Sequence, residues 1–231
     1  MAFYCNNNTD IKFTESTFRI MIVICYTEID QVWDENVFQR KLDQLPPVQQ
    51  ERILAYKNVP ERQLRLQGRL LIPEVLNYLD VTGFSFSALK LTDNNKPYVD
   101  ASVDFNIAHA GNILACAGVR NGLIGLDIEQ TKEISINDVR DQFQENEWQL
   151  ILQSDQPLQE VYRLWTRKEA VLKAAGKGML AEPMAVNAIK NVLRYEEHVY
   201  HLHTISIKEG YILSLATNLP NEEISLINCS L

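Results

Sequence analysis

The pair Asn121-Gly122 divides a long apolar stretch into two, and it is the feature that most limits how this chain can fold. Mostly apolar residues precede the pair at 113–119 and follow it at 123–128. Two-residue β-hairpin turns prefer Asn-Gly, because both turn positions need a positive φ. The sequence therefore predicts a β-hairpin over residues 113–130. Its second strand would end with two carboxylates, those of Asp127 and Glu129.

The rest of the chain predicts alternating strand and helix regions. Residues 18–26 have the composition of a buried strand, whereas 45–58 and 61–80 have the periodicity of amphipathic helices. Helices are expected again at 135–153 and 157–178, and strands between 185 and 218. We therefore expect an α+β fold of two similar α/β halves, 18–122 and 123–231. Residues 1–17 are expected to form a flexible leader.

Charge is unevenly distributed along the chain. Residues 40–70 hold seven basic and three acidic side chains, a net charge of +4, whereas 121–160 hold nine acidic and two basic ones, a net charge of −7. Each segment could be a solvated helical face, but the two together suit a phosphorylated ligand and its metal ion. The overall charge of −8 argues against general binding to nucleic acid or membrane surfaces.

Cysteine usage and hydropathy narrow the class of protein further. The four cysteines, at positions 5, 25, 116 and 229, form no CxxC or cysteine–histidine pattern. A reduced, cytoplasmic protein is therefore expected. The apolar run at 18–26 is far shorter than the roughly 20 residues of a membrane span.

Asp127 and Glu129 are two residues apart in the predicted strand, so their side chains share one face. Two adjacent carboxylates raise each other's pKa unless a cation lies between them. A pair of simply solvated acids would explain the spacing. The alternative is a site for a hard cation such as Mg²⁺, which binds one or two carboxylates together with substrate phosphates.

Two further groups of residues could carry chemistry. In the predicted helix 157–178, Glu169 and Lys173 lie four residues apart on one face, which is either a surface ion pair or part of a site. His109 lies among small residues, where it is either structural or open to close approach by a bulky ligand. Lys96 occupies a loop ahead of it.

The order of these segments resembles one family. "FNIAHAGN" (105–112), "GLDIEQ" (125–130), Phe143 with Glu147-Trp148, "WTRKEAVLK" (165–173) and "GKGM" (176–179) are similar to the motifs of the 4′-phosphopantetheinyl transferase superfamily. The length and the N-terminal half resemble its Sfp type, over about residues 46–217. The resemblance implies a single-chain pseudo-dimer, with halves related by a pseudo-two-fold axis and the active site in the cleft between them.

The resemblance also implies a reaction. The 4′-phosphopantetheine group of coenzyme A passes to a serine hydroxyl of an apo acyl, peptidyl or aryl carrier protein, and 3′,5′-ADP leaves. The cofactor is Mg²⁺, with Mn²⁺ as an alternative. The expected enzyme is a cytoplasmic monomer that binds neither nucleic acid nor membrane.

Site residues follow from the matching positions. The metal ligands would be Asp127, Glu129 and Glu169, and Glu169 would also take the serine proton. Lys173 would hold the pyrophosphate, with Lys168 assisting. Contacts to coenzyme A would come from His109, Lys96, Arg62 and Arg65. The carrier protein would contact the second half, with Met179 and Leu180 as candidates.

Two departures from the family pattern concern the nucleotide side. Ala108 and Ala110 flank His109, where the family usually has a hydroxyl residue, and Asn95 replaces the glycine of a Gly-Lys-Pro turn. These changes leave open a non-catalytic module that binds coenzyme A or a carrier protein. A metal-dependent phosphohydrolase or nuclease that uses the same carboxylates is a further alternative.

Overall fold

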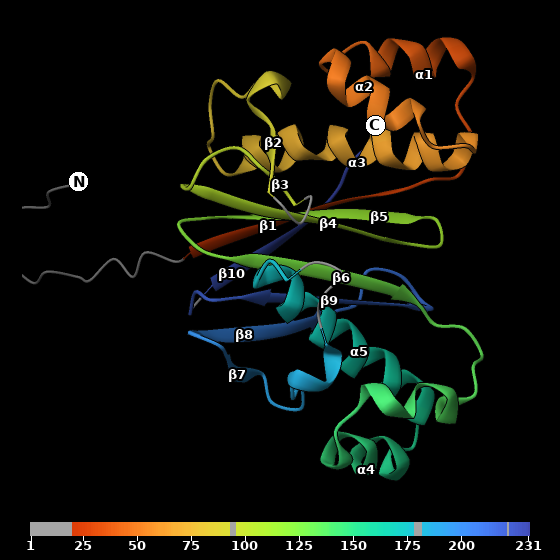
Figure 1. Ribbon diagram of the computed structural model, residues 1–231, viewed down its shortest axis with the longest axis vertical. Helices are drawn as coiled ribbons and strands as arrows, with labels where there is room; N and C mark the ends of the chain where they lie inside the picture. Colours follow the sequence, from red (N-terminus) through yellow and green to blue (C-terminus); the bar gives the residue numbers. More distant parts are fainter. Residues whose placement is uncertain (1–19, 93–95, 178–181, 221) are drawn as a thin grey trace, which may run out of the picture.

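The structure, a computed structural model, describes residues 20–92, 96–177, 182–220 and 222–231 and stacks them in four layers (Figure 1). A layer of helices covers the first sheet, the first sheet packs on a second one, and further helices cover the outer face of the second. The fold is therefore mixed α/β. The predicted leader 1–17, the turn residue Asn95 and the candidate contacts Met179 and Leu180 lie outside the described residues.

The first helical layer consists of α1 (Glu35–Leu42), α2 (Pro47–Leu54) and α3 (Val59–Tyr78). Asp34 and Asn58 cap α1 and α3, since each side chain accepts a hydrogen bond from a backbone N–H of the first turn. Pro73 lies inside α3 without ending it. The two predicted helices are α2 and α3, whereas the eight-residue α1 was not predicted.

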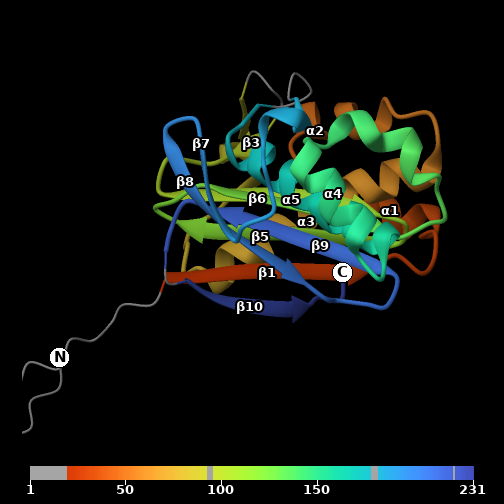
Figure 2. The same ribbon diagram turned by 90° about the horizontal axis from the view of Figure 1, so that it is seen from below.

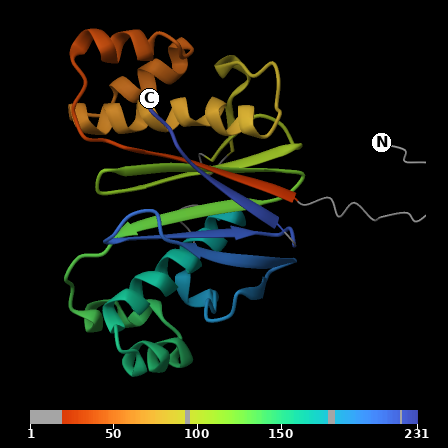
Figure 3. The same cartoon turned by 180° about the vertical axis from the view of Figure 1, so that it is seen from behind.

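The first sheet has the strand order β10-β1-β5-β4. Its members are β1 (Ile20–Glu28), β4 (Val103–Ala110), β5 (Ile113–Arg120) and β10 (Glu222–Asn228). β10 pairs with β1 in parallel, whereas the other pairs are antiparallel, and Figure 3 shows the two strands side by side. The expectation that residues 123–231 form one half needs correction, because the last strand returns to the sheet of the first half.

The second sheet has the order β6-β9-β8-β7 and is antiparallel throughout. Its strands are β6 (Ile124–Gln130), β7 (Val192–Tyr195), β8 (His198–Ile205) and β9 (Tyr211–Thr217). The helix α5 (Pro157–Ala174) packs on β6 and β9, and α4 (Glu145–Gln153) packs on α5. The core between the two sheets is formed by apolar side chains of β1, β4, β5, β6 and β9.

Shorter elements connect these layers. β2 (Lys90–Leu91) and β3 (Pro97–Tyr98) form a small separate sheet. Single 3₁₀ segments lie at Phe86–Ala88, Ile136–Gln142 and Pro183–Ala185. The predicted helix 135–153 is therefore two elements, because a capping box between Gln144 and Glu147 starts α4 anew.

The hairpin predicted at Asn121-Gly122 is wrong. Asn121 does adopt the left-handed conformation, with φ of 55°. However, β5 pairs with β1 and β4, and β6 pairs with β9 in the other sheet. Both edges of β5 are already hydrogen-bonded, so the turn carries the chain from one sheet into the next layer (Figure 1). Figure 2 looks along the stack, and the strands of the two sheets overlap in it.

Side chains of β4 join the two sheets where β4 faces β6. Asp104 Oδ2 accepts a hydrogen bond from the backbone N–H of Ile124 over 2.8 Å, and Asn106 Oδ1 accepts one from Leu126 over 3.0 Å. Backbone donors at the edge of β6 are thereby satisfied by side chains rather than by another strand. These two bonds hold β6 against β4 at the residues that precede Asp127.

Within the described residues, no helix has the length and apolar character needed to cross a membrane. Cys25, Cys116 and Cys229 are all free thiols.

Candidate active site

The backbone of α5 lies directly on β6 at Gly125. A Cβ atom at this position would be 2.0 Å from the carbonyl oxygen of Ala170 and 2.4 Å from the backbone nitrogen of Ala174. Only glycine permits this approach, because any side chain would collide with helix backbone. The contact sets Glu169 and Lys173, on α5, close to Asp127, two residues along the strand.

Asp127 and Lys173 form the centre of the site. Asp127 is 6% exposed, and its Oδ1 accepts a hydrogen bond from Lys173 Nζ over 2.6 Å. The other carboxylate oxygen, Oδ2, is buried and has no hydrogen-bond partner. Burial raises the pKa of Asp127, and the charge and hydrogen bond of Lys173 oppose that rise. A buried acceptor without a partner is a position where a cation would be stabilised.

Glu129 and Glu169 are half-buried beside Asp127. Burial raises the pKa of each carboxyl, and the negative charge of Asp127 raises both further, whereas Lys173 lowers them. A hydrogen bond from Trp165 also lowers the pKa of Glu129. The three carboxylates therefore influence one another electrostatically, and one ammonium group partly compensates them.

The donor chemistry fits a hard divalent cation, although the side chains are not gathered around one point. The three carboxylates, including the orphaned Oδ2 of Asp127, offer oxygen ligands of the kind that Mg²⁺ takes. In the described part of the chain, no three His, Cys, Asp or Glu side chains are grouped closely enough to hold a metal ion as they stand. Asp127, Glu129 and Glu169 are the side chains that would hold such a cation.

A cavity of 710 Å³ lies next to these carboxylates and is lined from α2, α3, β4 and α5. Lys173 belongs to both the cavity and the carboxylate group, since it lines the cavity and bonds to Asp127. Among the described residues, the lining contains no acidic side chain and five basic ones, Arg52, Arg65, Arg69, Lys96 and Lys173. Apolar groups complete it, including Ile53, Tyr56, Leu64, Ile107 and Leu114. Such a lining suits a ligand with several phosphates and an apolar or aromatic part.

His109 and Lys96 both line this cavity, as their predicted role requires. Burial lowers the pKa of His109, and the nearby charge of Arg65 lowers it further. Lys96 Nζ donates to Asp104 Oδ2 over 2.7 Å and to the carbonyl oxygen of Ile124 over 3.3 Å. Lys96 is thus held by the same aspartate that fixes β6.

The two arginines predicted to contact the ligand differ in position. Arg65 lines the cavity, bonds to Glu61 over 2.7 Å and lies over the ring of Tyr56 at 5.1 Å. Arg62 does not line the cavity and donates its Nε to the carbonyl oxygen of Tyr56. Arg52 and Arg69 do line it, although neither was predicted. In the sequence, the net charge of +4 over residues 40–70 was the feature that indicated a basic site including Arg52 and Arg69.

Lys168 does not reach the carboxylates, which corrects its predicted role in catalysis. It is completely buried and forms an ion pair with the equally buried Glu147 over 2.6 Å. Its Nζ also donates to the carbonyl oxygens of Pro183 and Val186. One residue along an α-helix is a rotation of about 100°, so Lys168 points to α4 while Glu169 points to the site.

Comparisons with known proteins agree on one family. A model of the 4′-phosphopantetheinyl transferase superfamily matches residues 123–216. "4′-phosphopantetheinyl transferase gsp" of Aneurinibacillus migulanus is 33% identical over 163 residues, which cover 69% of this chain and 68% of that protein. "4′-phosphopantetheinyl transferase Sfp" of Bacillus subtilis is 28% identical over 158 residues, or 65% of this chain and 69% of its own. "4′-phosphopantetheinyl transferase psf-1" of Bacillus pumilus is 26% identical over 216 residues, or 86% of this chain and 92% of its own.

Proposed function

Since this chain belongs to the 4′-phosphopantetheinyl transferase superfamily and is of the Sfp type, we propose that it transfers phosphopantetheine from coenzyme A to a serine of an apo carrier protein. The serine oxygen attacks the β-phosphate, a new phosphorus–oxygen bond forms, and the bond to 3′,5′-ADP breaks. The acceptor is an acyl, peptidyl or aryl carrier protein. The enzyme is proposed to act as a cytoplasmic monomer whose two halves are related by a pseudo-two-fold axis.

One observation carries this proposal. Lys173 lines the basic cavity and also contacts Asp127 in the carboxylate group. The cavity would hold a polyanionic nucleotide. The carboxylates would then lie beside the reacting phosphate, next to the cavity. Phosphoryl transfer needs the nucleotide site and the carboxylates close together, as they are when one side chain contacts both. The reason is that positioning and charge neutralisation provide most of its catalysis.

In this proposal Asp127, Glu129 and Glu169 would hold Mg²⁺, with Mn²⁺ as an alternative. When bound, the ion supplies positive charge that neutralises the pyrophosphate and removes the repulsion among the carboxylates. The orphaned Oδ2 of Asp127 supports this assignment.

The chain's own residues would carry the proton and hold the phosphates. Glu169 would accept the proton of the serine hydroxyl, since it matches the position of the base in the family's motif. Lys173 would stabilise the phosphate group that leaves. Arg52, Arg65, Arg69, Lys96 and His109 would bind the remaining phosphates of coenzyme A.

The direct test is to mix the purified chain with Mg²⁺, coenzyme A and a panel of apo carrier proteins. We expect one carrier to gain the mass of one phosphopantetheine group, and 3′,5′-ADP to appear in equal amount. Asp127→Asn should abolish the gain, whereas Asp155→Asn, which changes an exposed carboxylate, should not.

Other outcomes would point to other functions. Binding of coenzyme A by calorimetry with no transfer to any carrier would favour a non-catalytic module. Release of free phosphate in the absence of a carrier would favour a phosphohydrolase.

A further inference from the structure

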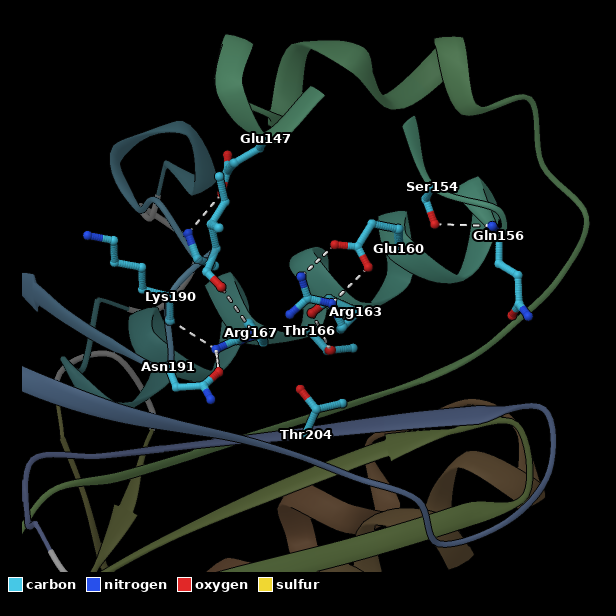
Figure 4. Close-up of polar contacts among 12 residues, drawn as sticks. Glu147, Ser154, Gln156, Glu160, Arg163, Thr166, Arg167, Lys190, Asn191 and Thr204 are labelled. Atoms are coloured by element: carbon cyan, nitrogen blue, oxygen red, sulfur yellow. Dashed lines mark hydrogen bonds and ion pairs between the residues drawn. The ribbon is translucent and has the colours of Figure 1, made fainter. Parts of the chain in front are cut away.

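A second cavity, of 490 Å³, lies on another side of α5 and shares no lining residue with the first. Its lining comes from α5, from the segment before β7, from β8 and from β10. Arg163 and Arg167, one helical turn apart on α5, provide two guanidinium groups. Figure 4 shows both arginines above Thr204, which also lines the cavity.

Arg167 is buried, with 3% of its surface exposed, and is not fully satisfied. Its terminal nitrogens donate to the carbonyl oxygens of Ile189 and Lys190 and to Asn191 Oδ1, the last over 2.7 Å. Its Nε is buried without any hydrogen-bond partner. All of its recorded acceptors are neutral, and within the described ranges no carboxylate forms an ion pair with it.

Arg163 and His203, which also line this cavity, already have carboxylate partners. Arg163 forms two hydrogen bonds with Glu160, at 2.9 and 2.5 Å. His203 pairs through Nε2 with the carboxylate of Glu222 on β10. Among the described residues, the buried charge of Arg167 is repelled by Arg163 and attracted by the more distant Glu160, and no carboxylate is bonded to it. An isolated buried charge is unfavourable, and an anion in the adjacent cavity would offset that cost.

Four apolar side chains form an apolar wall of the cavity, Leu202 and Ile205 from β8 and Ile224 and Leu226 from β10. Two neutral polar residues also line the cavity, Asn191, which accepts from the guanidinium of Arg167, and Thr204, whose hydroxyl is bonded to Ser214. A ligand that matches this lining has one anionic head group and a short apolar substituent.

We propose that this cavity binds a small organic oxyanion, a phosphate monoester or carboxylate with a short apolar group, and that Arg167 is its main anchor. The site is separate from the one proposed for coenzyme A, because the two cavities have no residue in common. Its occupant would contact α5, which also carries Glu169 and Lys173.

The test is a titration of the ¹⁵N-labelled full chain, followed by ¹H–¹⁵N NMR, with phenyl phosphate and butyrate as probes. We expect saturable shifts at the amides of Asn191, Leu202 and Thr204, with Kd on the order of 1 mM for at least one probe. Which probe binds identifies the head group. Amides at 107–109 report any binding in the first cavity separately.

Variants decide whether Arg167 is the anchor. Arg167→Met should weaken binding at least about tenfold, whereas Lys190→Met, which removes a nearby exposed charge and keeps the backbone acceptor, should not. Leu226→Glu keeps Arg167 and places a carboxylate of the chain itself in the lining of the cavity, at a position that is 40% exposed. This carboxylate should take the place of the ligand's anionic group and prevent binding. The variant therefore tests the proposal even if Arg167→Met fails to fold.

Three results would overturn the proposal. The first is no shift at these amides with either probe up to about 10 mM, tenfold above a millimolar Kd. The second is unchanged binding in Leu226→Glu. The third is equal binding of inorganic phosphate and phenyl phosphate, since the apolar wall would then contribute nothing.

Discussion

Lys173 Nζ lies 2.6 Å from Asp127 Oδ1, and this ion pair joins the carboxylates to the basic cavity. The lysine comes from α5 and the aspartate from β6, 46 residues apart in the chain. The pair is mostly buried, with 32% of the lysine side chain and 9% of the aspartate side chain exposed. Lys173 compensates the negative charge at Oδ1 of Asp127, whereas Oδ2 of the same carboxylate has no partner.

Replacing Lys173 by methionine should reduce phosphopantetheine transfer by roughly 10²–10³-fold, as loss of one charge-stabilising donor does in other active sites. The measurement is the rate of mass gain of an apo carrier at saturating coenzyme A. Lys177→Met is the matched control, because Lys177 pairs with Glu196 at the surface. Equal rates in the two variants would contradict the role of Lys173.

The carboxylates should make stability depend on pH. Folding raises the pKa of Asp127 above 3.8 and those of Glu129 and Glu169 above 4.5, so above these values the folded state holds more protons than the unfolded state. Their contribution to stability is present at low pH and is lost as pH rises through the folded pKa values. Each such proton contributes at most about 1.4 kcal/mol per pH unit to the slope.

Glu169→Gln should therefore flatten the decline of the unfolding free energy above pH 4.5, measured by urea denaturation at a series of pH values. Asp155→Asn should leave the slope as it is. Mg²⁺ should raise the melting temperature of the unaltered chain near neutral pH, since a ligand of the folded state stabilises it. An unaltered slope in Glu169→Gln would show that this carboxyl has an ordinary pKa.

Gly125→Ala should destabilise the fold by about 1–3 kcal/mol or more, because the new methyl group would overlap the backbone of α5. It should also lower transfer, since α5 would move relative to Asp127. Gly68→Ala is the control for stability alone, because Gly68 lines the first cavity and its Cβ would lie 3.5 Å from Ile107 in ordinary contact. That change should stabilise α3 by about 0.5–1 kcal/mol. Equal stability of the two variants would contradict the close approach.

Lys168→Met should lower the unfolding free energy by about 3–5 kcal/mol, because Glu147 would remain as a buried charge without its partner. The double variant with Glu147→Gln should recover part of that loss, which a double-mutant cycle measures. Transfer per folded molecule should stay close to that of the unaltered chain. If Lys168→Met kept full stability but lost transfer, Lys168 would have a role in catalysis after all.

Arg69→Met should raise KM for coenzyme A by roughly 10–100-fold, the effect of losing a charged hydrogen bond of about 1.5–3 kcal/mol. Arg62→Met should leave KM near its original value, because Arg62 bonds to Tyr56 outside the cavity lining. Steady-state kinetics with varied coenzyme A separates KM from kcat. An equal rise in both variants would contradict the assignment of the cavity.

Local sequence was informative where short-range geometry decides. The spacing of Asp127 and Glu129 and the i, i+4 spacing of Glu169 and Lys173 each indicated a shared face, and the pKa values of all three carboxyls respond to that arrangement. The family resemblance was confirmed by the comparisons. The excess of basic residues at 40–70 pointed to a segment that lines the first cavity, but it could not separate Arg69 from Arg62, because burial depends on what packs over α3.

The sequence by itself determined the family, the strand and helix character of most segments and the residue types of the candidate site. All of these depend on residues a few positions apart, whose relative geometry the backbone sets. Tertiary structure alone decided that the turn at Asn121 changes sheets, that β10 returns to β1 and that Lys168 is a structural ion pair. A strand's partner and a side chain's surroundings depend on packing between distant segments, which local periodicity does not encode.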